Sequence, residues 1–291
     1  MERELWTILY HHLKEVAERF RQKYVQHQPW VLVAVLLWAA LHDRPVCWAC
    51  REKNWSTTTL RPCTLPSPAT MSRRVDRVGV GLLWRALEER LRNCSADYPG
   101  LMAFLDGKPL PIGAASKDPD AGYGRGAAGM AKGYKLHTIW SNRALPEAWD
   151  IRPMNTSEPK VACALLGQLR SGGGYVIADG NYHASELFDV AASLGYVLVA
   201  PPRKGSTGKG HVYQSPHRLR FLDQWHRPFW QALLKRRGEI ERDYGQATCF
   251  GGGLAPLPAW VRGLDRVRTW VWAKLLINAT RILKNKALGH C

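Results

Sequence analysis

Apolar residues recur at spacings of three and four along the first 20 residues of the chain, with charged residues between them. This spacing places them on one stripe of an amphipathic helix. The stripe consists of Trp6, Leu9, Leu13, Val16 and Phe20. Either the rest of the chain or a second copy of it could cover the stripe, and we expect packing within the chain.

Two more helices with apolar positions are expected before residue 98. Residues 30–42 are apolar on nearly every side, which predicts a buried helix. Residues 78–91 again carry apolar residues at helical spacing. The beginning of the chain therefore predicts an all-helical region.

A short basic helix is predicted between these two. Ser67 suits the N-cap of a helix, and Pro68 suits its first position. The polar faces carry Arg73, Arg74 and Arg77, which is typical of a helix that enters a DNA major groove. A basic helix that only faces solvent is the alternative.

Beyond residue 97 the pattern changes to alternating strands and helices. The expected strands are 102–105, 108–112, 135–141, 144–153, 175–179 and 196–202. The expected helices are 157–171, 183–195, 228–248 and 268–283. This order is typical of an α/β (α+β) domain in which helices flank a mixed sheet. We therefore expect a helical domain over residues 1–97 and a layered domain over residues 98–291.

The charge balance indicates a polyanionic partner. Lys and Arg number 41 against 24 Asp and Glu, which gives a net charge of +17 and a pI near 9.8. Nucleic acid is the commonest partner of this kind, because Lys and Arg that neutralise phosphates release counterions. Charge alone leaves anionic membranes and ribosome-like assemblies open.

Neither the cysteines nor the apolar runs indicate export or membrane insertion. The seven cysteines are scattered and odd in number, which favours reduced thiols. The first 20 residues mix acids and bases, unlike a secretory signal. The longest apolar run, residues 31–41, is shorter than the roughly 20 residues that cross a bilayer. We expect a cytoplasmic, nucleoid-associated protein with no membrane partner.

Three acidic residues have the context of a metal site. Asp106 and Asp179 each follow an apolar strand, and Glu241 lies in a predicted helix. Acids at the ends of adjacent strands share one edge of a sheet, and a helical Glu beside that edge would complete a set of the oxygen ligands that Mg²⁺ prefers. Two Mg²⁺ ions there, with Mn²⁺ as a substitute, would support an in-line phosphoryl displacement. The alternatives are D-G turns for the aspartates and an ion pair for Glu241.

Four blocks of the sequence resemble a known family. LDGKPLP, AKGYKLHTIW, VIADGNYHA and KRRGEIERDYG, in this order, are similar to conserved blocks of the insertion-sequence transposases of groups four and five. The similarity covers about residues 100–290. It implies a ribonuclease-H-like fold, with Asp106 and Asp179 as the two catalytic aspartates. It also implies that Arg237 and Glu241 form the Arg-x-x-x-Glu part of the family signature, with Glu241 as the third metal ligand.

The helix of the third ligand departs from the family pattern. Where the family usually has a Tyr before the Arg and a Lys after the Glu, this chain has Leu234 and Thr248. Glu239 is an alternative to Glu241 as the third ligand. Contacts with DNA ends are expected from Arg236, Arg237 and Arg242.

Further DNA contacts are expected near the two aspartates. Residues 113–133 are rich in Gly and Ala, and they predict a mobile loop that follows a phosphate backbone through Arg125 and Lys132. Lys135 is expected to contribute as well. Tyr182 is expected to touch the strand being cut, or else to lie in a solvent-facing turn.

Two other motifs have little support. Cys47 and Cys50 form a CxxC, with Cys63 and His42 as further candidate zinc ligands, but a second CxxC is missing. Residues 124–129 match GxGxxG, but a dinucleotide site needs a strand before this motif and a helix after it.

The resemblance thus implies a DNA transposase. We expect it to cleave the terminal inverted repeats of an insertion sequence and to attach the freed 3′-hydroxyl to target DNA. A homodimer would hold both ends together. The alternatives are a ribonuclease-H-like nuclease without strand transfer and a catalytically inactive, domesticated DNA-binding protein.

Overall fold

The structure, a computed structural model, describes residues 2–95, 100–126, 129–202, 213–248, 250, 253–254 and 256–288. The chain divides into two compact units. Unit 1 comprises Met1–Asp97, Gln246–Val261 and Thr269–Cys291, and unit 2 comprises Tyr98–Gly245 and Arg262–Arg268. The predicted boundary near residue 98 lies outside the described residues. The C-terminal residues are divided between the units, unlike the single domain predicted for 98–291, and the roles of the two predicted domains stay predictions.

Unit 1 is helical. Its elements are α1 (Glu2–Ala17), η1 (Glu18–Phe20), α2 (Pro29–Leu41), α3 (Val46–Ala49), η2 (Glu52–Trp55), α4 (Pro68–Arg74), α5 (Val78–Ser95) and most of α11 (Leu264–Ala287). The predicted helices are confirmed, and the Ser67 hydroxyl accepts a hydrogen bond from the Thr70 N–H at 3.2 Å at the start of α4. Trp6, Leu9, Leu13 and Val16 are buried on α1, which confirms that this stripe packs within the chain, whereas Phe20 lies in η1 and is half-buried.

Three tryptophans form the centre of unit 1. The ring centroids of Trp38 and Trp55 are 4.7 Å apart and stacked, and Trp6 meets both rings edge-on at 4.9 and 5.6 Å. All three are at most 1% exposed, and each indole N–H donates to a backbone carbonyl. The cluster therefore combines a large buried apolar area with satisfied polar groups.

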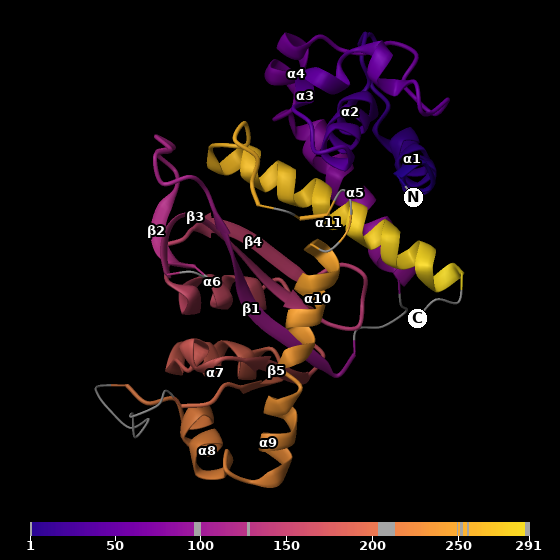
Figure 1. The fold of residues 1–291 in the computed structure, drawn as a ribbon. Helices are drawn as coiled ribbons and strands as arrows, with labels where there is room; N and C mark the ends of the chain where they lie inside the picture. Colours follow the sequence, from indigo (N-terminus) through magenta and orange to yellow (C-terminus); the bar gives the residue numbers. More distant parts are fainter. Residues whose placement is uncertain are drawn as a thin grey trace. The chain divides into compact units, whose positions relative to one another are not determined.

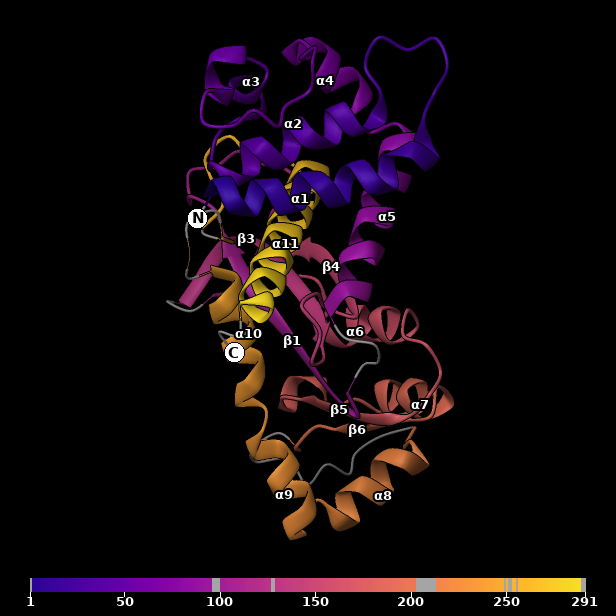
Figure 2. The ribbon, with the colours of Figure 1, turned by 90° about the vertical axis from the view of Figure 1, so that its right-hand side faces the viewer.

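Helix α11 packs among the N-terminal helices of unit 1 (Figure 2). Trp272 stacks on Trp84 of α5 at 5.6 Å. The buried Lys274 ammonium donates to the Ala40 carbonyl and to the Asp43 carboxylate, both at 2.6 Å. A buried ammonium needs such partners, because desolvation otherwise disfavours its charge. The end of α2 and the middle of α11 are thereby joined.

Unit 2 is built on a six-stranded mixed sheet (Figure 1). Its strands are β1 (Met102–Pro111), β2 (Gly122–Gly126), β3 (Gly129–Trp140), β4 (Ala148–Pro153), β5 (Gly174–Ala178) and β6 (Tyr196–Val199). The order is β2-β3-β1-β5-β6, with β4 also paired to β3. β1 is antiparallel to β3 and parallel to β5, and β5 is parallel to β6. The predicted mixed sheet flanked by helices is confirmed.

Helices lie on both faces of this sheet (Figure 2). They are α6 (Glu158–Leu166), η3 (Gly180–Tyr182), α7 (Ser185–Ser193), α8 (Pro216–Gln224), α9 (Pro228–Lys235) and α10 (Gly238–Thr248). On β3, Lys135 contacts Glu158 of α6 and Thr138 contacts Tyr244 of α10. Residues three apart on a strand point to opposite faces, so α6 and α10 cover opposite faces. Within the described ranges, no helix is long and apolar enough to cross a membrane.

Three sequence predictions for unit 2 were wrong in detail. β1 continues through Asp106-Gly107, where a turn was predicted, because β3 pairs with it over eight residues. The helix predicted over 228–248 is two helices, α9 and α10. Between the predicted strand 196–202 and the predicted helix 228–248, where no helix was expected, the chain forms α8, and residues 203–212 lie outside the described part.

About half of the predicted mobile loop over 113–133 belongs to a β-hairpin. Gly122–Gly126 pairs with Gly129–Gly133 in an antiparallel ladder. Ala127 and Ala128 at the turn lie outside the described residues. The Gly-rich composition gave no apolar alternation from which these strands could be predicted.

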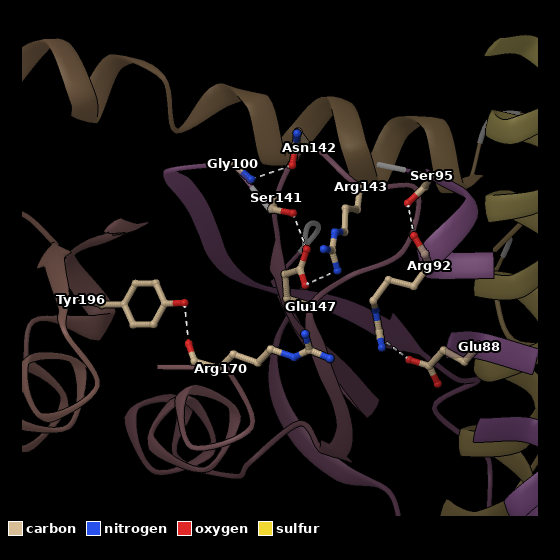
Figure 3. A network of polar contacts seen from close by, with 10 residues as sticks. All are labelled: Glu88, Arg92, Ser95, Gly100, Ser141, Asn142, Arg143, Glu147, Arg170 and Tyr196. Atoms are coloured by element: carbon tan, nitrogen blue, oxygen red, sulfur yellow. Dashed lines mark hydrogen bonds and ion pairs between the residues drawn. The ribbon is translucent and has the colours of Figure 1, made fainter. Parts of the chain in front are cut away.

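Polar contacts hold the turns at the edges of unit 2 (Figure 3). Glu147 accepts a hydrogen bond from the Ser141 hydroxyl at 2.5 Å and pairs with Arg143 at 3.5 Å, which closes the β3–β4 turn. Asn142 in the same turn accepts from the Gly100 N–H at 2.7 Å, just before β1. The ends of β1 and β3 are therefore fixed relative to each other.

Candidate active site

Two aspartates lie next to each other on neighbouring parallel strands. The pairing of β1 with β5 ends at Leu105 and Ala178, so Asp106 and Asp179 are the next residues along each strand. Paired residues of parallel strands point to the same face of the sheet. The charge of Asp179 acts on Asp106, in agreement with this placement. The structure therefore brings the first two predicted metal ligands together.

Local hydrogen bonds orient both carboxylates. The Gly107 N–H donates to Asp106 Oδ1 at 2.7 Å. Asp179 accepts from the Asn181 N–H at 2.8 Å and from the Asn181 side-chain amide at 3.3 Å, which caps η3. A Cβ at position 107 would lie 2.7 Å from Lys135 Cδ, so glycine leaves room for the lysine to pass behind the strand.

Asp106 lies in an electrostatically unfavourable environment. Burial raises the pKa of Asp106 to about 6, and the negative charges of Asp179 and Glu158 act in the same direction. The hydrogen bond from Gly107 and the charge of Arg237 oppose this rise. Carboxylates that repel one another in a partly buried place gain stability when a cation binds between them. The oxygen donors and their uncompensated negative charge therefore fit Mg²⁺.

Glu241 does not join the two aspartates in this conformation. Its side chain is 73% exposed, and Oε1 lies 4.0 Å from a guanidinium nitrogen of Arg237, the residue directly before α10. Across the described part of the chain, no three His, Cys, Asp or Glu side chains are grouped closely enough to hold a metal ion. The third predicted ligand thus stands apart from the other two.

The faces of α10 distinguish Glu241 from Glu239. Arg237, Glu241 and Tyr244 follow at spacings of four and three, which places them along one side of the helix. Both outer members interact with the first aspartate: the arginine through its charge, and the tyrosine hydroxyl by donating to the aspartate backbone carbonyl at 3.0 Å. Glu239 instead pairs with Arg236 at 2.5 Å. Of the two glutamates, only Glu241 lies on the same side of the helix as Tyr244, which interacts with the first aspartate.

A further acid near the aspartates was missed in the sequence. Glu158, the first residue of α6, forms a close ion pair with Lys135. Its charge acts on Asp106 and also on Tyr182, whose pKa is raised well above its ordinary value by burial and then by this charge. Acidic residues are common in the first turn of a helix, because they interact favourably with the helix dipole. The sequence around Glu158 therefore gave no reason to assign it to the site.

Three predicted DNA contacts are placed elsewhere. Lys135 is 8% exposed and paired with Glu158, and Tyr182 is fully buried, so neither side chain is at the surface. The Lys132 ammonium donates to the Ser116 carbonyl at 2.8 Å. Each of these groups is thus buried or has a partner within the chain, and its contact with DNA stays a prediction.

Arg125 is exposed but distant from the aspartates along the sheet. Arg125 of β2 pairs with Met130 of β3, whereas Asp106 of β1 pairs with Thr138, further along β3. Eight residues of strand separate these two positions, roughly 26 Å. The hairpin turn therefore does not lie near the first aspartate, where the predicted loop was expected.

The other predicted DNA contacts are partly or fully exposed. Arg73, Arg77, Arg236 and Arg242 are exposed, and Arg74 and Arg237 are half-buried. Arg236 pairs with Glu239, and it also donates to the Met102 sulfur at 3.1 Å at the start of β1. DNA binding by these arginines stays a prediction.

The candidate zinc ligands of unit 1 do not form a metal site in the described residues. Cys47, Cys50 and Cys63 are free thiols. Burial raises the pKa of Cys50 to about 11, which disfavours the thiolate that zinc requires. His42 instead stacks edge-on against Trp38 at 4.1 Å.

A six-stranded mixed sheet of this order, flanked by helices, is a ribonuclease-H-like fold. The family described as the transposase DDE domain matches residues 99–277, more than half of the chain, and the chain belongs to this family. No curated protein and no solved structure matches the chain. The predicted family and fold are thus confirmed, while membership of groups four and five stays a prediction.

The raised pKa predicts how stability depends on pH in the metal-free protein. Asp106 has a pKa of about 6 in the folded protein against an ordinary value of 3.8, so the stability that its protonation contributes is lost as the pH rises through about 6. Asp106→Asn cannot acquire this charge. Compared with the unmodified chain at the same pH, the unfolding free energy of the variant should be only slightly higher near pH 4 and higher by at most about 3 kcal/mol near pH 7.5. Urea unfolding in a chelator measures this, and an equal gain at both pH values would contradict it.

Proposed function

We propose that this chain cleaves the ends of a mobile DNA element and joins them to target DNA by phosphoryl transfer. One observation supports this most directly: Asp106 and Asp179 lie side by side in a chain of the transposase DDE family. The excess of 17 positive charges suits a DNA substrate. The substrate would be the terminal inverted repeats of the element.

In this proposal, Asp106, Asp179 and Glu241 hold two divalent ions. Bound Mg²⁺ would stabilise the charge that develops on the attacking and leaving oxygens. Gly107 and Asn181 orient the aspartate oxygens through the hydrogen bonds described above. The partial burial of the aspartates makes their attraction for a cation stronger than it would be in water.

Glu241 has to turn away from its present partner to reach the aspartates. The Arg237–Glu241 pair is long and largely exposed, and exposed pairs contribute about 0–1 kcal/mol. A DNA phosphate would be a stronger partner for Arg237 than this carboxylate. DNA binding would therefore favour the release of Glu241 at little cost.

The arginines of unit 1 and α10 would bind DNA in this scheme. Arg73, Arg74 and Arg77 lie on or just after α4, as a groove-reading helix requires. Arg236 and Arg242 lie on either side of Glu241 in the sequence, and both are exposed. A homodimer, with one copy at each DNA end, and a location with the nucleoid complete the proposal.

Two glutamine variants of α10 test the site. Glu241→Gln should lower Mg²⁺-dependent strand cleavage by about 10²-fold or more, because it removes a ligand charge. Glu239→Gln removes the same charge two residues away and should leave cleavage near that of the unmodified chain. Cleavage of duplexes that carry the element ends, with DNA binding measured in parallel, provides the comparison. The opposite ranking of the variants would assign the third ligand to Glu239.

The products distinguish transposition from its alternatives. A transposase yields strand-transfer products in which the 3′ end of the element is joined to target DNA. Hydrolysis without joining would indicate a nuclease. Salt-dependent DNA binding with no cleavage in either Mg²⁺ or Mn²⁺ would indicate an inactive DNA-binding protein.

A further inference from the structure

Tyr244 is a buried tyrosine whose hydroxyl contacts two strands of the sheet. The side chain comes from α10, and the residue is 7% exposed. Its hydroxyl donates to the backbone carbonyl of Asp106 at 3.0 Å and lies 2.7 Å from the hydroxyl of Thr138 on β3. The backbone of Lys108 also forms a hydrogen bond to this hydroxyl. One atom of α10 is therefore bound to β1 at the first aspartate and two residues beyond it, and to β3.

These contacts are specific to the hydroxyl. A buried phenol oxygen without partners is unfavourable, so the hydroxyl of Tyr244 depends on the fixed partners that the two strands supply. Phenylalanine at position 244 would fill the same volume without making any of these bonds. The ring also lies beneath the Lys108 ammonium at 5.5 Å, a contact that phenylalanine would keep.

The position of Tyr244 on α10 relates it to Glu241. The two residues are three apart, so they lie on the same side of the helix, about 4.5 Å apart along its axis. Just before α10 begins, Arg236 contacts Met102 near the start of β1. From Arg236 to Tyr244 the chain thus runs in the same direction as β1, and the tyrosine hydroxyl holds α10 at the level of the first aspartate.

We propose that Tyr244 is a positioning residue, whose hydroxyl fixes α10 against β1 so that Glu241 can complete the metal site with Asp106 and Asp179. This inference rests on the proposed function. Tyr244 itself need not touch metal or DNA. Loss of its hydroxyl would let α10 slide or turn by a fraction of a helical turn, and a misplaced third ligand weakens metal binding more than it weakens the fold.

The test is Tyr244→Phe, compared with Tyr134→Phe. Tyr134 is fully buried on β3, and its hydroxyl donates to Asp118 at 2.6 Å, so this control removes the same atom and an equally buried hydrogen bond. Mn²⁺ binding is measured by electron paramagnetic resonance, together with the Mg²⁺ dependence of strand cleavage and the thermal midpoint. Tyr244→Phe should raise the metal concentration for half-saturation about 10-fold in both measurements. Tyr134→Phe should lower the thermal midpoint about as much as Tyr244→Phe does, and it should leave metal binding unchanged.

Equal effects of the two variants on stability, with no change in metal binding by either, would overturn the proposal and leave Tyr244 a structural residue. If Tyr244→Phe does not fold, Thr138→Val takes its place, because it removes one partner of the same hydroxyl. It should shift the metal dependence in the same direction by less, and no shift would overturn the proposal. Asp106→Asn measured alongside separates the two hypotheses. If that variant binds Mn²⁺ and cleaves DNA normally, the proposed active site is wrong whatever Tyr244 does.

Discussion

The Asp106→Asn variant is expected to lose metal-dependent strand cleavage by about 10³-fold or more while it keeps its affinity for DNA. Asparagine has nearly the shape of aspartate but brings no charge to a cation. Burial raises the pKa of Asp106 to about 6, so a bound cation would compensate a charge that is unfavourable in the metal-free protein. Single-turnover cleavage of end-containing duplexes at saturating Mg²⁺ measures the loss.

Asp179→Asn should behave in the same way, since the two residues lie at the same level of the sheet. Asp118→Asn is a suitable control, because Asp118 is also a buried acid of unit 2 but bonds to Tyr134 and Gly263. Cleavage that survives Asp106→Asn but not Asp118→Asn would place the reaction elsewhere.

The Trp55→Ala variant is expected to lower the unfolding free energy of unit 1 by about 3–5 kcal/mol. Trp55 is 1% exposed, stacks on Trp38, meets Trp6 edge-on, and donates its indole N–H to the Ala49 carbonyl at 2.8 Å. Alanine would leave a cavity and an unpaired carbonyl at the centre of the cluster. Denaturant unfolding, followed by tryptophan fluorescence and circular dichroism, reports the change.

Trp48→Ala provides the matched comparison, because Trp48 is only half-buried and has His42 as its ring neighbour at 5.3 Å. It should cost clearly less. Similar losses from the two variants would mean that the three-tryptophan cluster does not control the stability of this unit.

Elements with strong apolar periodicity could be predicted from the sequence. The stripe of α1, the apolar run of α2 and the short buried strands β5 and β6 all lie where the spacing of their residues placed them. In each case the local pattern and the tertiary packing favour the same structure, which is what makes a prediction from pattern alone succeed.

Elements stabilised mainly by their neighbours could not be predicted. Asp106-Gly107 has the composition of a turn, yet the pairing with β3 keeps it extended. The same holds for the Gly-rich strand β2, whose pairing with β3 supplies what its side chains lack. Long-range pairing leaves no mark in the composition of a short segment.

The candidate site divides in a similar way. Asp106 and Asp179 could be inferred as neighbours, because acids that follow buried parallel strands meet at one edge of the sheet. The contributions of Glu158 and Tyr244 could not, since both depend on which helix covers which face of the sheet. Lys135 shows the same limit, because only the structure reveals that its partner is Glu158 rather than a phosphate.

Helix α11 has a consequence for how this protein can be divided. Its residues from Thr269 onward belong to unit 1, although they come last in the chain, and Lys274 and Trp272 are held there by α2 and α5. A polypeptide truncated after residue 97, or begun there, would expose the apolar side of α11 or lose it altogether. The two units therefore cannot be exchanged between related proteins by a single crossover at that point.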